Sequence, residues 1–91
     1  MDISLVIPAY NESGIIMDTI QTVSARLAEL TAEYEVLVVD DGSTDGMAEL
    51  VRGCGDPRVR LEGYASNRGK GCAVRTGMLA AKGDVILCTD A

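Results

Sequence analysis

The stretch Tyr34-Glu35-Val36-Leu37-Val38-Val39-Asp40-Asp41-Gly42 decides the fold class of this chain. Its four central residues are all apolar, whereas a strand with one solvated face alternates polar and apolar residues. A strand that is covered on both faces has this unbroken pattern, which is typical of parallel sheets flanked by helices. The two aspartates and the glycine favour a turn, so we expect the strand to run from Tyr34 to Val39 and to be followed directly by carboxylates.

A strand pattern and a helix pattern precede this stretch. Ile3–Ile7 is a short β-rich run, and we expect Pro8 to end it because proline cannot continue a central ladder. Asn11 or Ser13 is a suitable N-cap for the helix that follows. The apolar face of that helix recurs at four- and three-residue steps, at Ile16, Ile20, Val23, Leu27 and Leu30.

Helix and strand patterns continue to alternate further along the chain. The expected elements are a short helix from Met47 to Gly53 or Gly55, a strand over Val59–Gly63, a helix opened by the glycine-rich turn Asn67–Gly71 and running through Lys82, and a strand over Asp84–Thr89. We expect the apolar run Val85–Cys88 of the last strand to be buried. The order β-α-β-α-β-α-β predicts one three-layer, Rossmann-like α/β domain over residues 1–91, with a mainly parallel sheet and right-handed crossovers.

Composition excludes several classes of function. With 47% hydrophobic and 24% charged residues the chain has the make-up of a globular protein, and its net charge of −6 argues against binding nucleic acid. It has no histidine, so any chemistry must rest on carboxylates, backbone amides and Lys or Arg side chains. Its three widely spaced cysteines do not fit a disulfide or zinc framework. With no signal peptide and no apolar run of membrane length, we expect a cytoplasmic protein.

Polar clusters follow the ends of the predicted strands. They are Pro8-Ala9-Tyr10-Asn11-Glu12 after the first strand, Asp40-Asp41-Gly42-Ser43 after the second, the turn Asn67–Gly71 before the last helix, and Thr89-Asp90 after the fourth strand. Parallel sheets bind ligands beyond the carboxyl ends of their strands, where the strand order reverses. Carboxylates combined with backbone amides, the basic residues Arg68 and Lys70 and a divalent cation would hold a nucleotide diphosphate.

Other interpretations of these residues remain open. Each cluster by itself also fits a turn or a helix cap, because Asp, Asn, Ser and Gly favour both. Standard phosphate loops do not fit, since Tyr64 stands where a P-loop has its first glycine and Gly71 where it has Ser or Thr. The dinucleotide pattern GxGxxG would follow the first strand, where Pro8-Ala9-Tyr10 stands instead.

A receiver-like signalling module is a second hypothesis. Residues 36–42 (VLVVDDG) are similar to the acidic pair that ends the first strand of such modules, and Asp90 would be the phosphoacceptor. A receiver would begin near Glu35, however, which leaves the strand Ile3–Ile7 and the helix after it without a role. A third hypothesis is a nucleotide-binding or scaffold protein without catalysis.

Three segments in order, SLVIPAYNE (4–12), YEVLVVDDGSTDG (34–46) and NRGKGCAVRTGMLAAKGDVILCTDA (67–91), resemble the opening half of inverting glycosyltransferases of family 2, which have the GT-A fold. The third segment is most similar to the dolichyl-phosphate β-glucosyltransferase branch, followed by polyprenyl- and dolichyl-phosphate mannose synthases. The resemblance covers essentially the whole chain. It implies binding of a nucleoside-diphosphate sugar, UDP-glucose or GDP-mannose, and hexosyl transfer to a polyprenyl or dolichyl phosphate.

The resemblance also implies roles for single residues in binding the nucleotide. The loop after the first strand would wrap the base and the ribose through Pro8, Ala9, Tyr10 and Glu12, with Glu12 near the ribose or base. Asp41, the second acid of its pair, would accept a hydrogen bond from the base. A carboxylate suits this role because uracil and guanine both present an N–H donor.

For the diphosphate, the resemblance implies that Gly69 and Lys70 pass close to the nucleotide. Asp90 would be the first acid of an Asp-x-Asp motif that holds Mg²⁺ or Mn²⁺. Ala91 would be its middle residue, so we expect the second acid, the acceptor-binding half and any catalytic base to lie beyond it. The 91 residues alone should then be inactive, as part of an enzyme at the cytoplasmic face of a membrane. Uncovered sheet surfaces would favour a homodimer.

Overall fold

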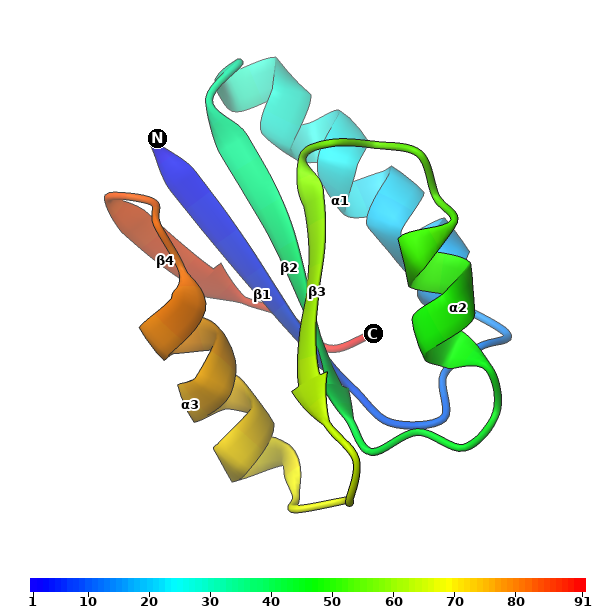
Figure 1. Ribbon diagram of the computed structural model, residues 1–91. Helices are drawn as coiled ribbons and strands as arrows, with labels where there is room; N and C mark the ends of the chain where they lie inside the picture. Colours follow the sequence, from blue (N-terminus) through cyan, green and yellow to red (C-terminus); the bar gives the residue numbers. More distant parts are fainter.

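The computed structural model describes all residues from 1 to 91, as a four-stranded sheet with helices on both faces (Figure 1). All three strand pairings are parallel. The elements, in chain order, are β1 (Ile3–Ala9), α1 (Ile16–Leu30), β2 (Tyr34–Asp41), α2 (Met47–Arg52), β3 (Val59–Tyr64), α3 (Lys70–Ala80) and β4 (Val85–Cys88). The predicted order of elements and the three-layer α/β class are confirmed.

The strand order in the sheet is β3-β2-β1-β4. The chain thus builds the sheet outward from β1 to β3 and then returns to the far side of β1 with β4. The order reverses between β1 and β4, and a doubly wound sheet binds ligands at such a point, beyond the carboxyl ends of the strands. Helices α1 and α2 cover one face and α3 covers the other (Figure 1).

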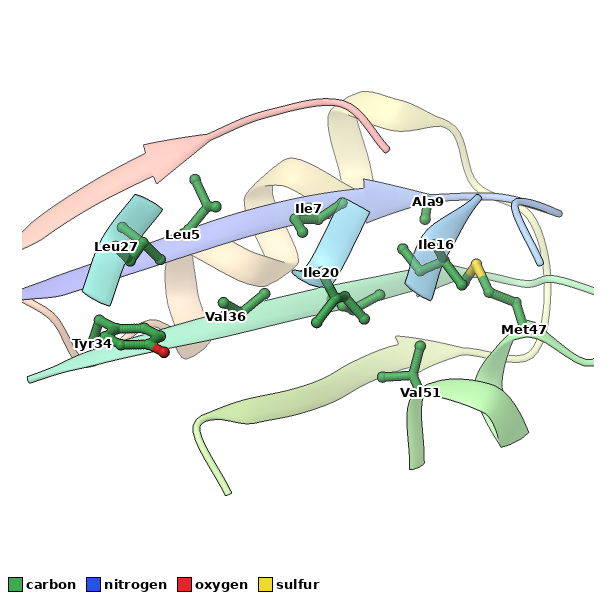
Figure 2. Close-up of a cluster of buried hydrophobic side chains, with 11 residues drawn as sticks. Leu5, Ile7, Ala9, Ile16, Ile20, Leu27, Tyr34, Val36, Met47 and Val51 are labelled. Carbon is green, nitrogen blue, oxygen red and sulfur yellow. The ribbon is translucent and has the colours of Figure 1, made fainter. Parts of the chain in front are cut away.

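Two apolar clusters, one on each face, hold the sheet between its helices. The larger joins β1 and β2 to α1 and α2 (Figure 2) through Leu5, Ile7, Ala9, Ile16, Ile20, Leu27, Tyr34, Val36, Val38, Met47 and Val51. The smaller lies under α3 and consists of Val6, Leu37, Val39 and Ala73. Successive side chains of β2 alternate between these clusters, so its apolar run is buried on both faces as predicted. The expectation that Asp40 and Asp41 end this strand was wrong, because both residues still pair with β3.

The expectation that Pro8 ends the first strand was wrong, because β1 continues to Ala9. The backbone oxygens of Asp2 and Val6 accept hydrogen bonds from the β4 segment, so the even-numbered residues of β1 face that side. Pro8 faces the same side, but β4 has already ended at Cys88. The missing N–H of Pro8 therefore leaves no ladder bond unmade.

The ends of two helices also differ from the prediction. Neither Asn11 nor Ser13 caps α1, which begins after Ile15 with no side-chain cap, because both residues bond instead to the loop after β2. Helix α3 ends at Ala80 rather than at Lys82 because the next residue has extended backbone angles.

β4 is exposed, contrary to the expectation that its apolar run is buried. All four of its residues are exposed, and Val85, Ile86 and Leu87 keep 52%, 39% and 42% of their surface. The physical reason is its place at the edge of the sheet, since the close helix packing is made by β1, β2 and β3. None of the helices combines the length and the apolar character that crossing a membrane requires.

We expect the chain to self-associate through β4, because its apolar side chains and one backbone edge are uncovered. Light scattering over a range of concentrations should show a dimer that Leu87→Glu shifts toward monomer. Leu50→Glu is the matched control, since Leu50 is 43% exposed on α2, away from β4. A monomer at all concentrations would contradict this expectation.

Candidate functional site

One pocket of about 400 Å³ lies at the carboxyl ends of β1 and β2, beside the N-terminus of α3. It contains all eight residues that the sequence singled out: Pro8, Ala9, Tyr10, Glu12, Asp41, Gly69, Lys70 and Asp90. Asn67, Ala73 and Ala91 complete its lining. A larger groove of about 880 Å³ between α2 and β3 contains none of the eight.

Asp41 is the buried anchor of this pocket, with 4% of its surface exposed. Its carboxylate accepts three hydrogen bonds from the turn before α3. The backbone N–H of Arg68 donates to Oδ1 at 2.8 Å, and that of Gly69 donates to Oδ2 at 3.0 Å. The amide of Asn67 donates to Oδ2 at 3.1 Å. Gly69 has φ 95°, a backbone angle that favours glycine, so this turn depends on it.

The surroundings of Asp41 keep its carboxylate ionised. Burial by itself would raise the pKa of this group, but hydrogen bonding from the Tyr64 side chain and from the backbone N–H groups of Arg68 and Gly69, together with the charge of Arg68, holds its pKa below the usual value. Burial and the neighbouring Asp41 carboxylate raise the pKa of Tyr64, which therefore keeps its proton. The guanidinium of Arg68 stacks on the Tyr64 ring, 4.8 Å from its centroid. Asp41 is thus an ionised carboxylate held in place by several hydrogen bonds.

The loop after β1 is tied to the loop after β2. The N–H of Asn11 donates to Ser43 Oγ at 2.9 Å, and the N–H of Thr44 donates to Asn11 Oδ1 at 2.8 Å. The N–H of Ser13 donates to Asp45 Oδ2 at 3.0 Å, and this bond is the first reason that the pKa of Asp45 is lowered. These bonds fix the loop that carries Tyr10 and Glu12 to the pocket.

Sequence reasoning missed the residues that position the site. Ser43 and Asp45 belong to a polar cluster that also fits a turn, and Asn67 lies in the predicted glycine-rich turn. No sequence signal indicates that Asn67 bonds to Asp41 or that Ser43 and Asp45 bond to the first loop. Their partners are 26 to 32 residues away along the chain, and only the parallel sheet brings them together.

Lys70 and Asp90 face each other across the pocket mouth as an exposed ion pair. The side chain of Asp90 keeps 75% of its surface, and that of Lys70 keeps 66%. Exposed pairs of this kind contribute little to stability, so both groups are free to exchange partners.

The pocket fits a metal ion only together with a phosphate ligand. The chain has no group of three His, Cys, Asp or Glu side chains that could hold a metal ion alone. Mg²⁺ in nucleotide sites is commonly held by one or two carboxylates, phosphate oxygens and water. Asp90 supplies such a carboxylate, while Lys70 and the unbonded first N–H groups of α3 suit an anion.

Comparisons with known proteins agree with this arrangement. A sequence model described as Glycosyl transferase family 2 matches residues 4–91. An undecaprenyl-phosphate 4-deoxy-4-formamido-L-arabinose transferase of Aeromonas hydrophila is 38% identical over 98% of this chain and 28% of its own length. A dolichyl-phosphate beta-glucosyltransferase of Drosophila melanogaster is 38% identical over 100% of this chain and 31% of its own length.

A solved mannosyltransferase from Pyrobaculum calidifontis, in complex with GDP-Man and Mn²⁺, superposes with a TM-score of 0.80 at 29% identity, over 97% of this chain and 26% of that one. This neighbour confirms the expected GT-A arrangement. The present chain spans less than a third of the length of both relatives. The family match includes β1 and α1, the elements that a receiver-like module would leave without a role. The chain belongs to glycosyl transferase family 2.

Proposed function

We propose that this chain binds the nucleoside-diphosphate sugar, UDP-glucose or GDP-mannose, of an enzyme that transfers a hexose with inversion to a polyprenyl or dolichyl phosphate. The observation that supports this most is the single pocket shared by Asp41, Lys70 and Asp90 at the reversal of the strand order. The names of the two relatives support a polyprenyl or dolichyl phosphate acceptor. The GDP-Man complex of the mannosyltransferase supports a nucleotide-sugar donor.

The base and ribose would lie between the loop after β1 and Asp41. A carboxylate has about four acceptor positions, of which three on Asp41 are used by the turn before α3. The N–H of uracil or guanine could take the remaining position on Oδ1, in competition with the Tyr64 hydroxyl that neighbours this carboxylate. Tyr10 is 45% exposed in this loop and offers its ring to the base, while Glu12 offers an acceptor to the ribose.

The diphosphate would lie at the N-terminus of α3, where Lys70 and backbone N–H groups favour negative charge. Asp90 would then leave Lys70 and hold Mg²⁺ or Mn²⁺ against the phosphate oxygens. A divalent metal bound there would offset the charge on the departing diphosphate. The Mn²⁺ in the neighbouring mannosyltransferase supports a divalent metal.

The absence of histidine from these 91 residues is compatible with a lipid phosphate acceptor. The second pKa of a phosphate monoester is about 6, so the acceptor is already largely anionic near pH 7 and needs less help from a general base than a sugar hydroxyl does. The whole enzyme would work at the cytoplasmic face of a membrane, where such lipids present their phosphates.

Titration calorimetry should detect binding of UDP or GDP that Mn²⁺ strengthens. Asp90→Asn should lower the affinity by about tenfold or more in Mn²⁺ and change it little in EDTA, because the lost carboxylate acts through the metal. Asp84→Asn is the matched control, since Asp84 is exposed at the opposite end of β4. Equal loss in Mn²⁺ and in EDTA would contradict the role of Asp90.

Asp41→Ala should weaken UDP or GDP binding in Mn²⁺ and in EDTA alike, because Asp41 supports the base and the turn before α3 rather than the metal. The same calorimetric titration tests this, with circular dichroism to confirm that the variant is folded. Unchanged affinity would count against the proposed role of Asp41.

The lowered pKa of Asp41 predicts that the stability of the chain depends on pH. The pKa of this carboxyl group is lower in the folded chain than its ordinary value of 3.8, so its contribution is complete above that value and is lost as the pH falls through the folded pKa. The free energy of unfolding should therefore fall below about pH 4, and it should fall less in Asp41→Asn. Urea titrations between pH 7 and pH 3 measure both, and equal acid sensitivity of the two proteins would refute the prediction.

Residues 1–91 by themselves should bind the donor nucleotide without appreciable turnover, because a metal bound through Asp90 would lack the second acid that the Asp-x-Asp motif of the family supplies. A mass-spectrometric assay with UDP-glucose or GDP-mannose and a short polyprenyl phosphate tests this. Robust product formation would overturn it.

A further inference from the structure

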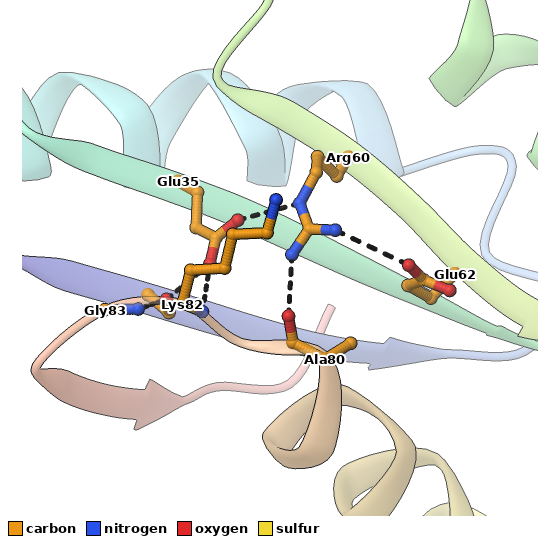
Figure 3. A network of polar contacts seen from close by, with 7 residues as sticks. Glu35, Arg60, Glu62, Ala80, Lys82 and Gly83 are labelled. Atoms are coloured by element: carbon orange, nitrogen blue, oxygen red, sulfur yellow. Dashed lines mark hydrogen bonds and ion pairs between the residues drawn. The ribbon is translucent and has the colours of Figure 1, made fainter. Parts of the chain in front are cut away.

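A second buried carboxylate, Glu35, lies at the end of the sheet opposite the pocket. Glu35 is 2% exposed and belongs to the N-terminal end of β2 (Figure 3). Its partners come from β1, from β3 and from the turn between α3 and β4. No part of the proposed donor binding uses Glu35, so its buried charge calls for a separate explanation.

Three donors satisfy the Glu35 carboxylate. The hydroxyl of Ser4 donates to Oε2 at 2.6 Å, and the backbone N–H of Lys82 donates to the same oxygen at 2.8 Å. Nε of Arg60 donates to Oε1 at 2.8 Å. Burial by itself would raise the pKa of Glu35, but these hydrogen bonds and the charge of Arg60 hold that pKa below the usual value.

Two of these partners also hold the turn between α3 and β4. Nη2 of Arg60 donates to the backbone oxygen of Ala80 at 2.8 Å (Figure 3), and the N–H of Gly83 donates to Ser4 Oγ at 2.8 Å. A Cβ at Gly83 would lie 2.5 Å from the backbone N of Ser4, so the turn is pressed against β1. Glu35 is the centre of a network that holds the last residue of α3, Ala80, and two residues of the turn, Lys82 and Gly83.

β4 has little else to hold it in place. It pairs with β1 alone, over four residues, and each of its residues is exposed. The backbone bonds to the β1 segment begin where Asp84 donates to Met1 and Val85 donates to Asp2, and they end where Thr89 donates to Val6. Asp90 follows directly, about 16 Å along the strand from Val85. An exposed edge strand of this length opens easily unless its ends are fixed.

We propose that Glu35 is a positioning residue that docks β4 on β1 and thereby holds Asp90 at the donor pocket. The Glu35 carboxylate accepts a hydrogen bond from Lys82, in the turn that leads into β4. This bond fixes the start of β4 and thereby its register against β1. The part of this inference that concerns Asp90 rests on the proposed function, whereas the docking of β4 does not.

Amide-resolved hydrogen exchange tests the docking directly. In Glu35 one carboxylate oxygen accepts from Arg60 and the other accepts from Ser4 and Lys82. The glutamine of Glu35→Gln has only one acceptor oxygen, so either Arg60 or the pair Ser4 and Lys82 loses its acceptor. Exchange at Val85 and Thr89 should then accelerate by about tenfold or more relative to exchange in the core of β2.

Two further variants make this test decisive. Glu62→Gln is the matched control, because Glu62 also pairs with Arg60, at 3.5 Å, but does not contact the turn, and it should leave β4 exchange unchanged. Ser4→Ala removes one hydroxyl from the network at nearly constant volume and should accelerate β4 exchange in the same sense. If Glu35→Gln does not fold, the exchange rate of β4 relative to that of the β2 core in Ser4→Ala decides. Unchanged β4 exchange, or acceleration only in step with β2, overturns the proposal.

Nucleotide binding tests the effect on Asp90. The gain in UDP or GDP affinity on adding Mn²⁺ should shrink in Glu35→Gln and persist in Glu62→Gln, while affinity in EDTA stays the same in both. A general loss of stability would not change this ratio in the folded protein. A full Mn²⁺ gain in Glu35→Gln would overturn the positioning of Asp90. If the wild-type chain itself shows no Mn²⁺ gain, the proposed function fails, and hydrogen exchange still decides the docking of β4.

Discussion

The burial of two carboxylates, one at each end of β2, is the constraint on which the rest of the structure depends. Glu35 and Asp41 lie on the same face of β2, with Leu37 and Val39 between them under α3. A buried carboxylate must be hydrogen-bonded, and each of these accepts three such bonds. Asp41 takes them from the turn that enters α3, while Glu35 takes one from the turn that leaves it. One strand therefore fixes both ends of one helix.

This constraint separates two kinds of acid in the site. The charge of Asp41 is satisfied inside the protein and shapes the turn that carries Lys70 to the pocket. The charge of Asp90 is exposed and paired only with Lys70, so it can exchange its partner when a ligand arrives. Asp41 is held in place by the turn before α3, whereas Asp90 can change its partner. In the proposed function, Asp41 would serve the base as a fixed acceptor, and Asp90 and Lys70 would serve the metal and the phosphates.

Much of the fold and of the site could be predicted because the underlying rules are local or topological. The unbroken run Val36–Val39 indicates a strand buried on both faces, and alternating helices make its sheet parallel. Parallel strands end at the same edge, so the polar clusters had to meet there. The wrong predictions concern which strand or helix lies next to a residue in the folded chain. Pro8 stays in β1 because β4 has already ended, and Val85–Cys88 is exposed because no helix packs closely over β4.

The sequence by itself determined the order of the elements and the parallel sheet, because periodicity is a property of the chain. The polar clusters at the strand ends and the family resemblance also named eight residues of the pocket lining. The sequence also carried the three segments by which the family is identified. Only the tertiary structure decided which of those residues are partners. Asn11 and Ser13 could cap a helix or tie two loops, and Glu35 could be a solvated strand residue or a buried anchor. Hydrogen bonds between groups 25 to 47 residues apart made that choice, and no local pattern encodes them.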